Sequence, residues 1–177
     1  MSYVSTTTLL AAVKTALEAL ALDPTNDPQG AKLFDAVAYY NLREPAKALN
    51  DLFLTQEQRV CFIVAGGDGY ANNGGRDPVS VTSHRTTDFE LMLCDRVWEK
   101  KDPAAVLGGD DNIGVLALKD RAVAALQGQS LGISGVVLLP QEGGLVDLFD
   151  PRGTEQGRTC WVQSFNTYAG HTKLAVT

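Results

Sequence analysis

The residues whose types and spacing come nearest to a chemical site run from Cys61 to Pro78, CFIVAGGDGYANNGGRDP, with five glycines after an apolar run. A strand followed by a glycine-rich loop begins many nucleotide sites, because N–H groups at the next helix N-terminus bind phosphate. In the phosphate-loop pattern, however, Gly75 and Arg76 stand where a lysine and a hydroxyl residue are required. The pattern GxGxxG fails at Asn72, and the residues after Pro78 predict a strand instead of a helix. We therefore expect no phosphate site here.

The favoured interpretation of residues 66–86 is a long flexible loop between two antiparallel strands, with glycines and asparagines that allow positive φ. Its acidic and amide side chains do not follow the spacing of an EF-hand, so we expect no metal. Loops of this length are usually functional or disordered. We expect this one to become ordered on contact with a neighbouring protein.

Other catalytic arrangements are equally weak. Cys94, His84 and Asp88 fall in one predicted strand, where Asp88 and Cys94 would lie about 20 Å apart. The spacing GxSxG occurs at residues 128–132, GQSLG, but there it follows a predicted helix, whereas the turn of serine hydrolases lies between a strand and a helix. We therefore expect a protein that is not an enzyme and has no cofactor. A small α+β enzyme or ligand-binding domain that uses the glycine-rich segment 66–78 remains the alternative.

The three cysteines, Cys61, Cys94 and Cys160, are far apart and lie in apolar segments without a CxxC pair. This pattern predicts buried, reduced thiols in a reducing compartment. The N-terminal segment lacks the basic start of a signal peptide and carries Lys14 and Glu18 within its apolar part. We expect neither export nor a membrane span, and a cytoplasmic site of synthesis.

The length of the chain indicates the number of domains, and its net charge limits the kinds of partner. A chain of 177 residues is typical of a single domain, so we expect one α+β domain over residues 1–177. The formal net charge is −6. Because phosphate contacts from Lys and Arg supply most of the affinity for nucleic acid, we expect no sequence-specific nucleic-acid partner.

Hydrophobic periodicity predicts the elements that must position any site. Leu10, Val13, Leu17 and Leu20 share one face of a helix over residues 5–22. Further helices are expected at 44–58, beginning near Pro45, and at 108–128, with Asp110 or Asp111 as cap, Leu116, Val123 and Leu126 on the core side, and Gly128 as its end. Strands are expected at 32–42, 59–66, 77–98, 134–143, 145–149 and 158–169.

The strand at 59–66 is apolar throughout, which predicts a central position in the sheet. In the following strand, Phe89, Leu91 and Leu93 alternate with Glu90 and Met92, which predicts one buried face. Two adjacent strands without a helix between them indicate antiparallel pairing. The expected fold is α+β, with a mixed or mostly antiparallel sheet and two to three helices packed on one face.

The order of these elements, together with TTDFELMLCDRVW, IGVLALKDRAVAAL and RTCWVQSFNTYAG, resembles the tail terminator (tail-completion) proteins of long-tailed bacteriophages, of the lambda type. The resemblance covers most of residues 5–170. It implies a hexameric ring that closes the head-proximal end of the tail tube and binds the head connector, without catalysis or cofactor. The partners would be further copies of the chain, the tail tube protein and the connector or neck protein. The location would be the virion, after assembly in the host cytoplasm.

The sequence suggests how such a ring would form. A sheet that is not closed has edges, and a heterologous contact can pair one edge with another. We expect the strand at 158–169 to contribute, and the polar loops at 66–86 and 150–157 to make axial contacts. The candidate interface residues are Asp68, Tyr70, Asn72, Asn73, Arg76, Arg152, Glu155, Trp161 and Gln163. The alternatives are another head-tail connector or neck protein and, for the aromatic residues, simple packing in the core of a monomer.

Overall fold

The structure is a computed structural model that describes residues 5–40, 59–73, 81–95, 98–99, 104–109, 113–149 and 156–174. The helices and strands are α1 (Thr6–Glu18), β1 (Ala21–Asp23), β2 (Asp27–Lys32), β3 (Ala36–Tyr39), β4 (Val60–Asn73), β5 (Val81–Cys94), β6 (Trp98–Glu99), α3 (Ala104–Leu107), α4 (Val115–Leu126), β7 (Val136–Phe149) and β8 (Gln156–Leu174).

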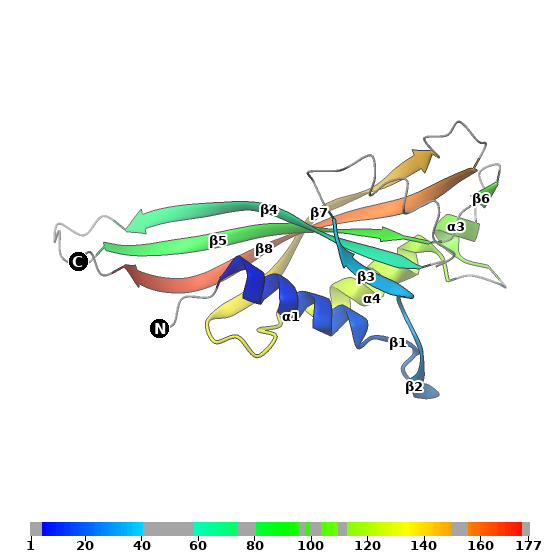
Figure 1. Cartoon of the computed structure of the whole chain (residues 1–177), viewed down its shortest axis with the longest axis horizontal. Helices are drawn as coiled ribbons and strands as arrows, with labels where there is room; N and C mark the ends of the chain where they lie inside the picture. The colour runs from blue at the N-terminus through cyan, green and yellow to red at the C-terminus, as the bar shows by residue number, and fades with distance from the viewer. Residues whose placement is uncertain are drawn as a thin grey trace.

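The main sheet is mostly antiparallel, which confirms the expected α+β class (Figure 1). Its strands lie in the order β3-β4-β5-β8, and β7 pairs with the other side of β8. Only β3 and β4 run parallel among the described strands; β6 continues the line of β5 along β8. The strand predicted at 59–66 is indeed central, because β4 lies between β3 and β5.

Alternation along β5 fixes which face of the sheet is covered. Phe89, Leu91 and Leu93 are fully buried, whereas Glu90 between them is exposed. A slip of one residue would turn this whole apolar set to solvent, so the pattern specifies the register. Phe89 stacks on Phe165 of β8 with ring centroids 5.3 Å apart.

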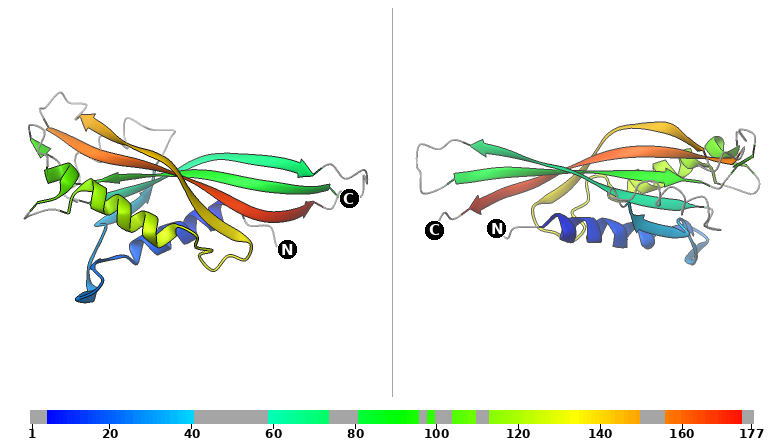
Figure 2. Two further views of the ribbon diagram at one scale, coloured as in Figure 1. Left: turned by 180° about the vertical axis from the view of Figure 1, so that it is seen from behind. Right: turned by 45° about the horizontal axis from the view of Figure 1, so that its top comes forward.

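Two helices, α1 and α4, pack on this apolar face (Figure 2). In α1 the buried residues are Leu9, Leu10, Val13 and Leu17, a spacing of three and four that puts them on one side. In α4 they are Val115, Leu118, Ala122 and Leu126. Leu116, which was expected on the core side of α4, is only half-buried. The buried face of α4 is therefore rotated relative to the expected one. The helix expected at 44–58 lies outside the described residues.

The first helix is shorter than the predicted 5–22. Ser5 caps it by accepting a hydrogen bond from the N–H of Thr8, and it ends at Glu18. The next residues form the β1–β2 hairpin, whose turn is held by the Asp23 carboxylate, an acceptor for the N–H groups of Thr25 and Asn26. Such a local side-chain bond competes with the helix, which explains the early end.

The start of α4 depends on a contact that the sequence does not reveal. Gly114 is the N-cap with a φ of 80°, and its N–H donates to Oδ2 of the buried Asp95 at 2.8 Å. Arg158, also buried, donates to the carbonyl oxygen of Asp95. The expected caps Asp110 and Asp111 lie outside the described residues, whereas Gly128, with a φ of 71°, closes the helix as predicted.

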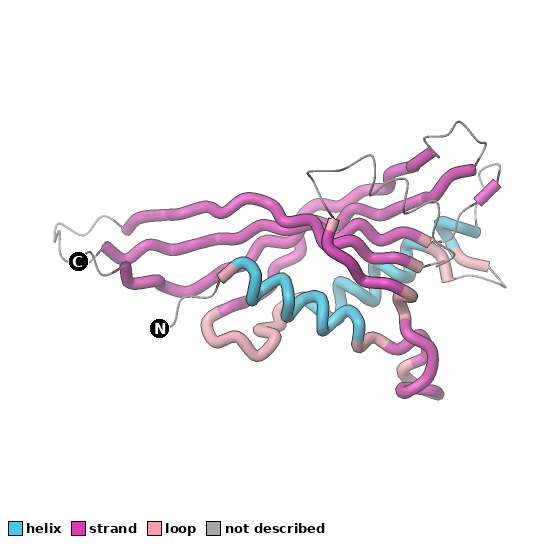
Figure 3. The backbone as a smooth tube through the Cα atoms, viewed as in Figure 1, coloured by secondary structure: helices cyan, strands magenta, loops and turns pink. Residues whose placement is uncertain are grey.

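The expected loop at 66–86 is mostly strand, which corrects the prediction. Strand β4 continues to Asn73 and β5 begins at Val81, and the two pair from Asp68–Thr87 to Asn73–Thr82 (Figure 3). The pairing is irregular between Ala65 and Asp68. Polar cross-strand contacts replace apolar ones here: the hydroxyl of Thr87 donates to Asp68 Oδ1 at 2.7 Å. Without apolar alternation, hydrophobic periodicity could not detect these strands.

A second correction concerns the tail of the chain. The strands expected separately at 134–143 and 145–149 are one strand, β7, with an irregularity between Pro140 and Gly143. The side chain of Gln163 holds this irregularity, because its Nε2 donates to the carbonyl oxygen of Gln141 at 2.8 Å. A Cβ on Gly143 would lie 2.7 Å from the Gln163 side chain. This crowding explains the glycine.

Candidate subunit interface

Three strands project beyond the helices as a polar arm. It consists of β4 from Gly66, β5 up to Thr87 and β8 from Thr167, and it extends to the left of α1 in Figure 1. Asp68 is exposed at its base. Tyr70, Asn72 and Asn73 lie on β4 of the arm, whereas Arg76 lies outside the described residues. The structure therefore groups four of the predicted interface residues on one strand.

The predicted residues on β8 have a different environment. Up to Ala169, strand β8 lies between β5 and β7, so this part of it is not an edge available to a neighbour. Gln163 is only 4% exposed. Trp161 is half-buried, donates from Nε1 to Gln163 Oε1, and has Lys119 Nζ 5.4 Å from its ring centroid. We therefore assign both to packing within the chain; Arg152 and Glu155 lie outside the described residues.

One half of the outer edge of β7, the side facing away from β8, is already covered. The N–H of Leu138 donates to the carbonyl oxygen of Gln129, and the N–H of Gly128 donates to that of Leu138. The other half, Gly144–Phe149, pairs only with β8 among the described strands. This half is a free edge, and it carries Leu145 and Val146, which are 50% and 41% exposed.

The opposite side of the sheet has a free edge as well. Strand β3 pairs with β4 and with no other described strand. Tyr39 at its end is 49% exposed. Beyond Ile63, β4 too lacks a described partner on that side. Residues 144–149 and 36–39 were not among the predicted interface residues, although the apolar run LVDLF was a signal that could have been used.

A hollow of about 440 Å³ lies on the sheet face opposite the helices. Gly66, Gly67, Glu90 and Gln141 line it, together with the polar pair Asp88 and Asn166, whose Nδ2 donates to Asp88 Oδ1 at 2.9 Å. Within the described residues no group of three or more His, Cys, Asp or Glu side chains is placed to hold a metal. The hollow is polar and open, and a small ligand could occupy it.

The cysteines differ from the prediction. Cys94 and Cys160 form a disulfide between directly opposed positions of β5 and β8, with Cα atoms 4.2 Å apart. The expectation of three reduced thiols is therefore wrong for this pair. Cys61 is a free, buried thiol as expected, and burial raises its pKa. The pair is 66 residues apart in sequence, so only the strand register brings it together.

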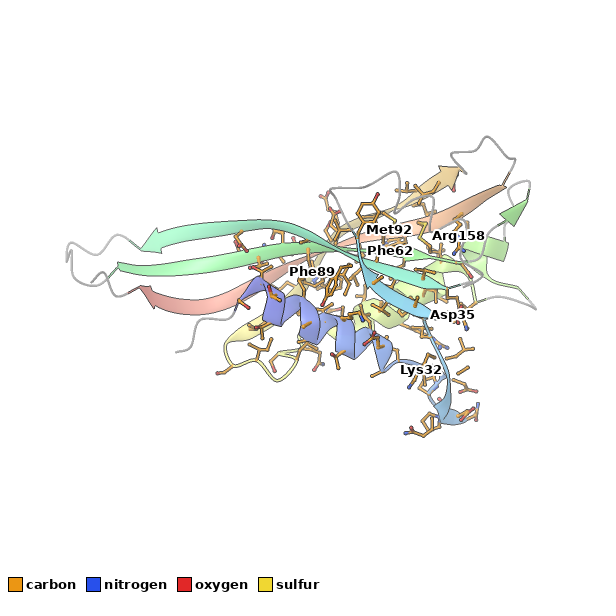
Figure 4. All side chains as sticks on the ribbon, viewed as in Figure 1. Lys32, Asp35, Phe62, Phe89, Met92 and Arg158 are labelled. Atoms are coloured by element: carbon orange, nitrogen blue, oxygen red, sulfur yellow. A yellow bond between two sulfur atoms is a disulfide. The ribbon has the colours of Figure 1, made fainter. Side chains whose placement is uncertain are left out.

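The disulfide belongs to a small cluster on the second face of the sheet. Val60, Cys94 and Cys160 are buried there, with Phe62 and Met92 packed against them. Figure 4 shows Phe62 and Met92 above the sheet, whereas Phe89 lies on the side of α1. The end of the sheet near β3 and the free half of β7 thus has apolar side chains on both faces.

Comparison with known proteins leaves the family open. No protein-family model matches the chain, and no curated protein matches its sequence. Among the described residues there is no helix with the length and apolar character needed to cross a membrane.

Proposed function

We propose that the chain is a tail terminator of a long-tailed bacteriophage, a structural protein of the virion without catalytic activity. Copies form a ring, six by the resemblance, that closes the head-proximal end of the tail tube and binds the head connector. The observation that supports this best is an open, mostly antiparallel sheet with a free, apolar edge on each side. Ring assembly by a heterologous contact needs two such complementary surfaces on one chain.

The polar arm is suited to the axial contacts of such a ring. It projects past the helices and carries Asp68, Tyr70, Asn72 and Asn73 (Figure 1). A three-stranded extension without a covering helix buries little apolar surface by itself, so contact with another protein would stabilise it. In this proposal the arm meets the tail tube protein or the connector, and the helix-covered part of the sheet forms the ring.

Two alternatives stay open. Another connector or neck protein would use the same edges in a ring at a different level of the virion. A ligand-binding domain would use the hollow beside Gly66 and Gly67, which is where the alternative based on residues 66–78 would place its ligand. Titration with small ligands and analysis of virions separate these functions.

Purified virions of the phage that encodes the chain test the proposal. Mass spectrometry should detect the protein in stoichiometric amounts, and antibody labelling should place it at the junction of head and tail. A tail terminator also binds isolated tails at one end, whereas a connector protein binds heads first. Absence of the chain from virions, or labelling along the whole tail, would refute the proposal.

A further inference from the structure

The two free edges of the sheet run in opposite directions. Strand β3 is parallel to β4, and the register alternates in direction from β4 through β5 and β8 to β7. Strands β3 and β7 are therefore antiparallel to each other. When a second copy is placed beside the first in the same orientation, its β3 meets β7 as an antiparallel neighbour, the commoner and slightly more stable pairing.

The free edges also lie at the same height along the strands. One continuous row of paired positions crosses the sheet from Ala36 through Val60, Cys94 and Cys160 to Val146. The row that begins at Ala38 ends at Gly144 in the same way. A copy rotated about an axis along the strands thus brings Ala36–Tyr39 of β3 beside Gly143–Val146 without sliding. The part of β4 beyond Ile63 has no such pairing partner. At the same level along the strands, the outer edge of β7 is already hydrogen-bonded to residues 128–129.

The backbone groups match in this alignment. In β3, the N–H groups of Ala36 and Tyr40 point to β4, so those of Val37 and Tyr39 point outward. The Cα atoms of Cys94 and Cys160 are 4.2 Å apart, which is typical of a non-hydrogen-bonded pair of β5 and β8. The N–H and carbonyl of Cys160 therefore point away from β5, toward β7, where they pair with Val146. Leu145 then points its N–H and carbonyl outward. Leu145 and Val37 end the same row, so their free groups meet.

The side chains at both edges suit a covered surface. Tyr39, Leu145 and Val146 are among the few large apolar side chains that are at least two-fifths exposed. Edge strands that remain unpaired in the native protein usually carry charged side chains. A Cβ on Gly144 would meet no described atom within 4 Å, so the described part of its own chain does not account for this glycine. Glycine inside a strand often marks the close approach of another backbone.

Charged residues lie beside both free edges. Asp147 is exposed on β7, one position beyond Val146. Asp147 pairs with Thr159, one position beyond the row that ends at Ala36, so its level on the other edge is that of Asp35, which forms a salt bridge of 2.7 Å with Arg59. Arg59 Nε is buried and has no hydrogen-bond partner among the described residues. Beside a second copy, Asp147 therefore lies opposite Asp35, whose carboxylate is already paired with the Arg59 guanidinium on the next strand.

We propose that the free half of β7 pairs antiparallel with β3 of the next copy, with Gly144 beside Ala38 and Val146 beside Ala36. The sheet then continues from subunit to subunit. The contact itself does not depend on the proposed function; only the closure of the copies into a ring rests on it.

Cysteine cross-linking tests the contact. Opposed non-hydrogen-bonded positions have Cα atoms about 4.5 Å apart, which suits a disulfide. The variant with both Gly144→Cys and Ala38→Cys should form a ladder of covalent oligomers on oxidation, in concentrated solution or on isolated tails. Each single variant should stay monomeric on a denaturing gel, because the contact joins two different edges. Absence of a ladder in both settings, or covalent dimers from Gly144→Cys alone, would overturn the contact.

Two further variants separate the contact from folding and from the proposed function. Leu145→Lys should weaken self-association, measured by light scattering, whereas Leu107→Lys, at an exposed position on α3, should leave it unchanged. Both should keep the wild-type melting temperature. If the double-cysteine protein binds tail ends but forms no ladder, the contact is wrong and the terminator function stands. If the ladder forms but the chain is absent from virions, the contact stands and the terminator function is wrong.

Discussion

The disulfide between Cys94 and Cys160 should dominate the stability of the single chain. It closes a loop with a sequence separation of 66 residues. In the chain-entropy account, a loop of this length lowers the entropy of the unfolded chain enough to stabilise the fold by about 4 kcal/mol. For a chain of this length, about 4 kcal/mol corresponds to a shift in melting temperature of about 10 °C.

The measurement compares oxidised and reduced protein in urea and in thermal unfolding. Reduction should lower the free energy of unfolding by about 4 kcal/mol and leave the far-UV circular dichroism unchanged. In the variant Cys61→Ala the difference between oxidised and reduced protein should persist, because Cys61 is the free cysteine. Three reactive thiols in unfolded, unreduced protein from virions would refute the disulfide. Equal stability of the two forms would refute the loop-entropy reasoning.

Three other outcomes follow from the buried side chains and the glycine-rich segment. Phe89→Ala should lower the free energy of unfolding by about 3–5 kcal/mol in urea, because Phe89 is fully buried and stacked on Phe165; a loss below about 1 kcal/mol would contradict the packing. The Cys61 thiol should resist alkylation at pH 8 in native protein, because burial raises its pKa, and rapid labelling would count against its burial. Calorimetric titration with ATP, GTP or NAD should show no binding; micromolar affinity that Gly69→Val removes would reinstate a nucleotide site.

Apolar alternation made much of the fold predictable. Phe89, Leu91 and Leu93 identified the buried face of β5, and the spacing of Leu10, Val13 and Leu17 identified the inner side of α1. These patterns work because burial of apolar surface sets both register and helix orientation. The class of the fold followed from them.

Features held by polar contacts were not predictable from the pattern. The arm has cross-strand polar pairs such as Asp68 with Thr87, and a glycine-rich sequence with such pairs is typical of a loop as well. Gln163 was expected at an interface, yet its amide donates to the carbonyl oxygen of Gln141 at the irregularity of β7. The free edges depend on which strands become neighbours, and that is decided by contacts between residues far apart in the chain.

Tail length in the absence of this chain tests the central claim most directly. A phage carrying an early stop codon in its gene is grown, and the tails and particles are examined by electron microscopy. A tail terminator should be required to end the tube and join it to the head, so tails should have irregular, extended lengths and heads should lack tails. Adding the purified protein during assembly should restore joining. Tails of normal length, joined to heads in its absence, would contradict the account.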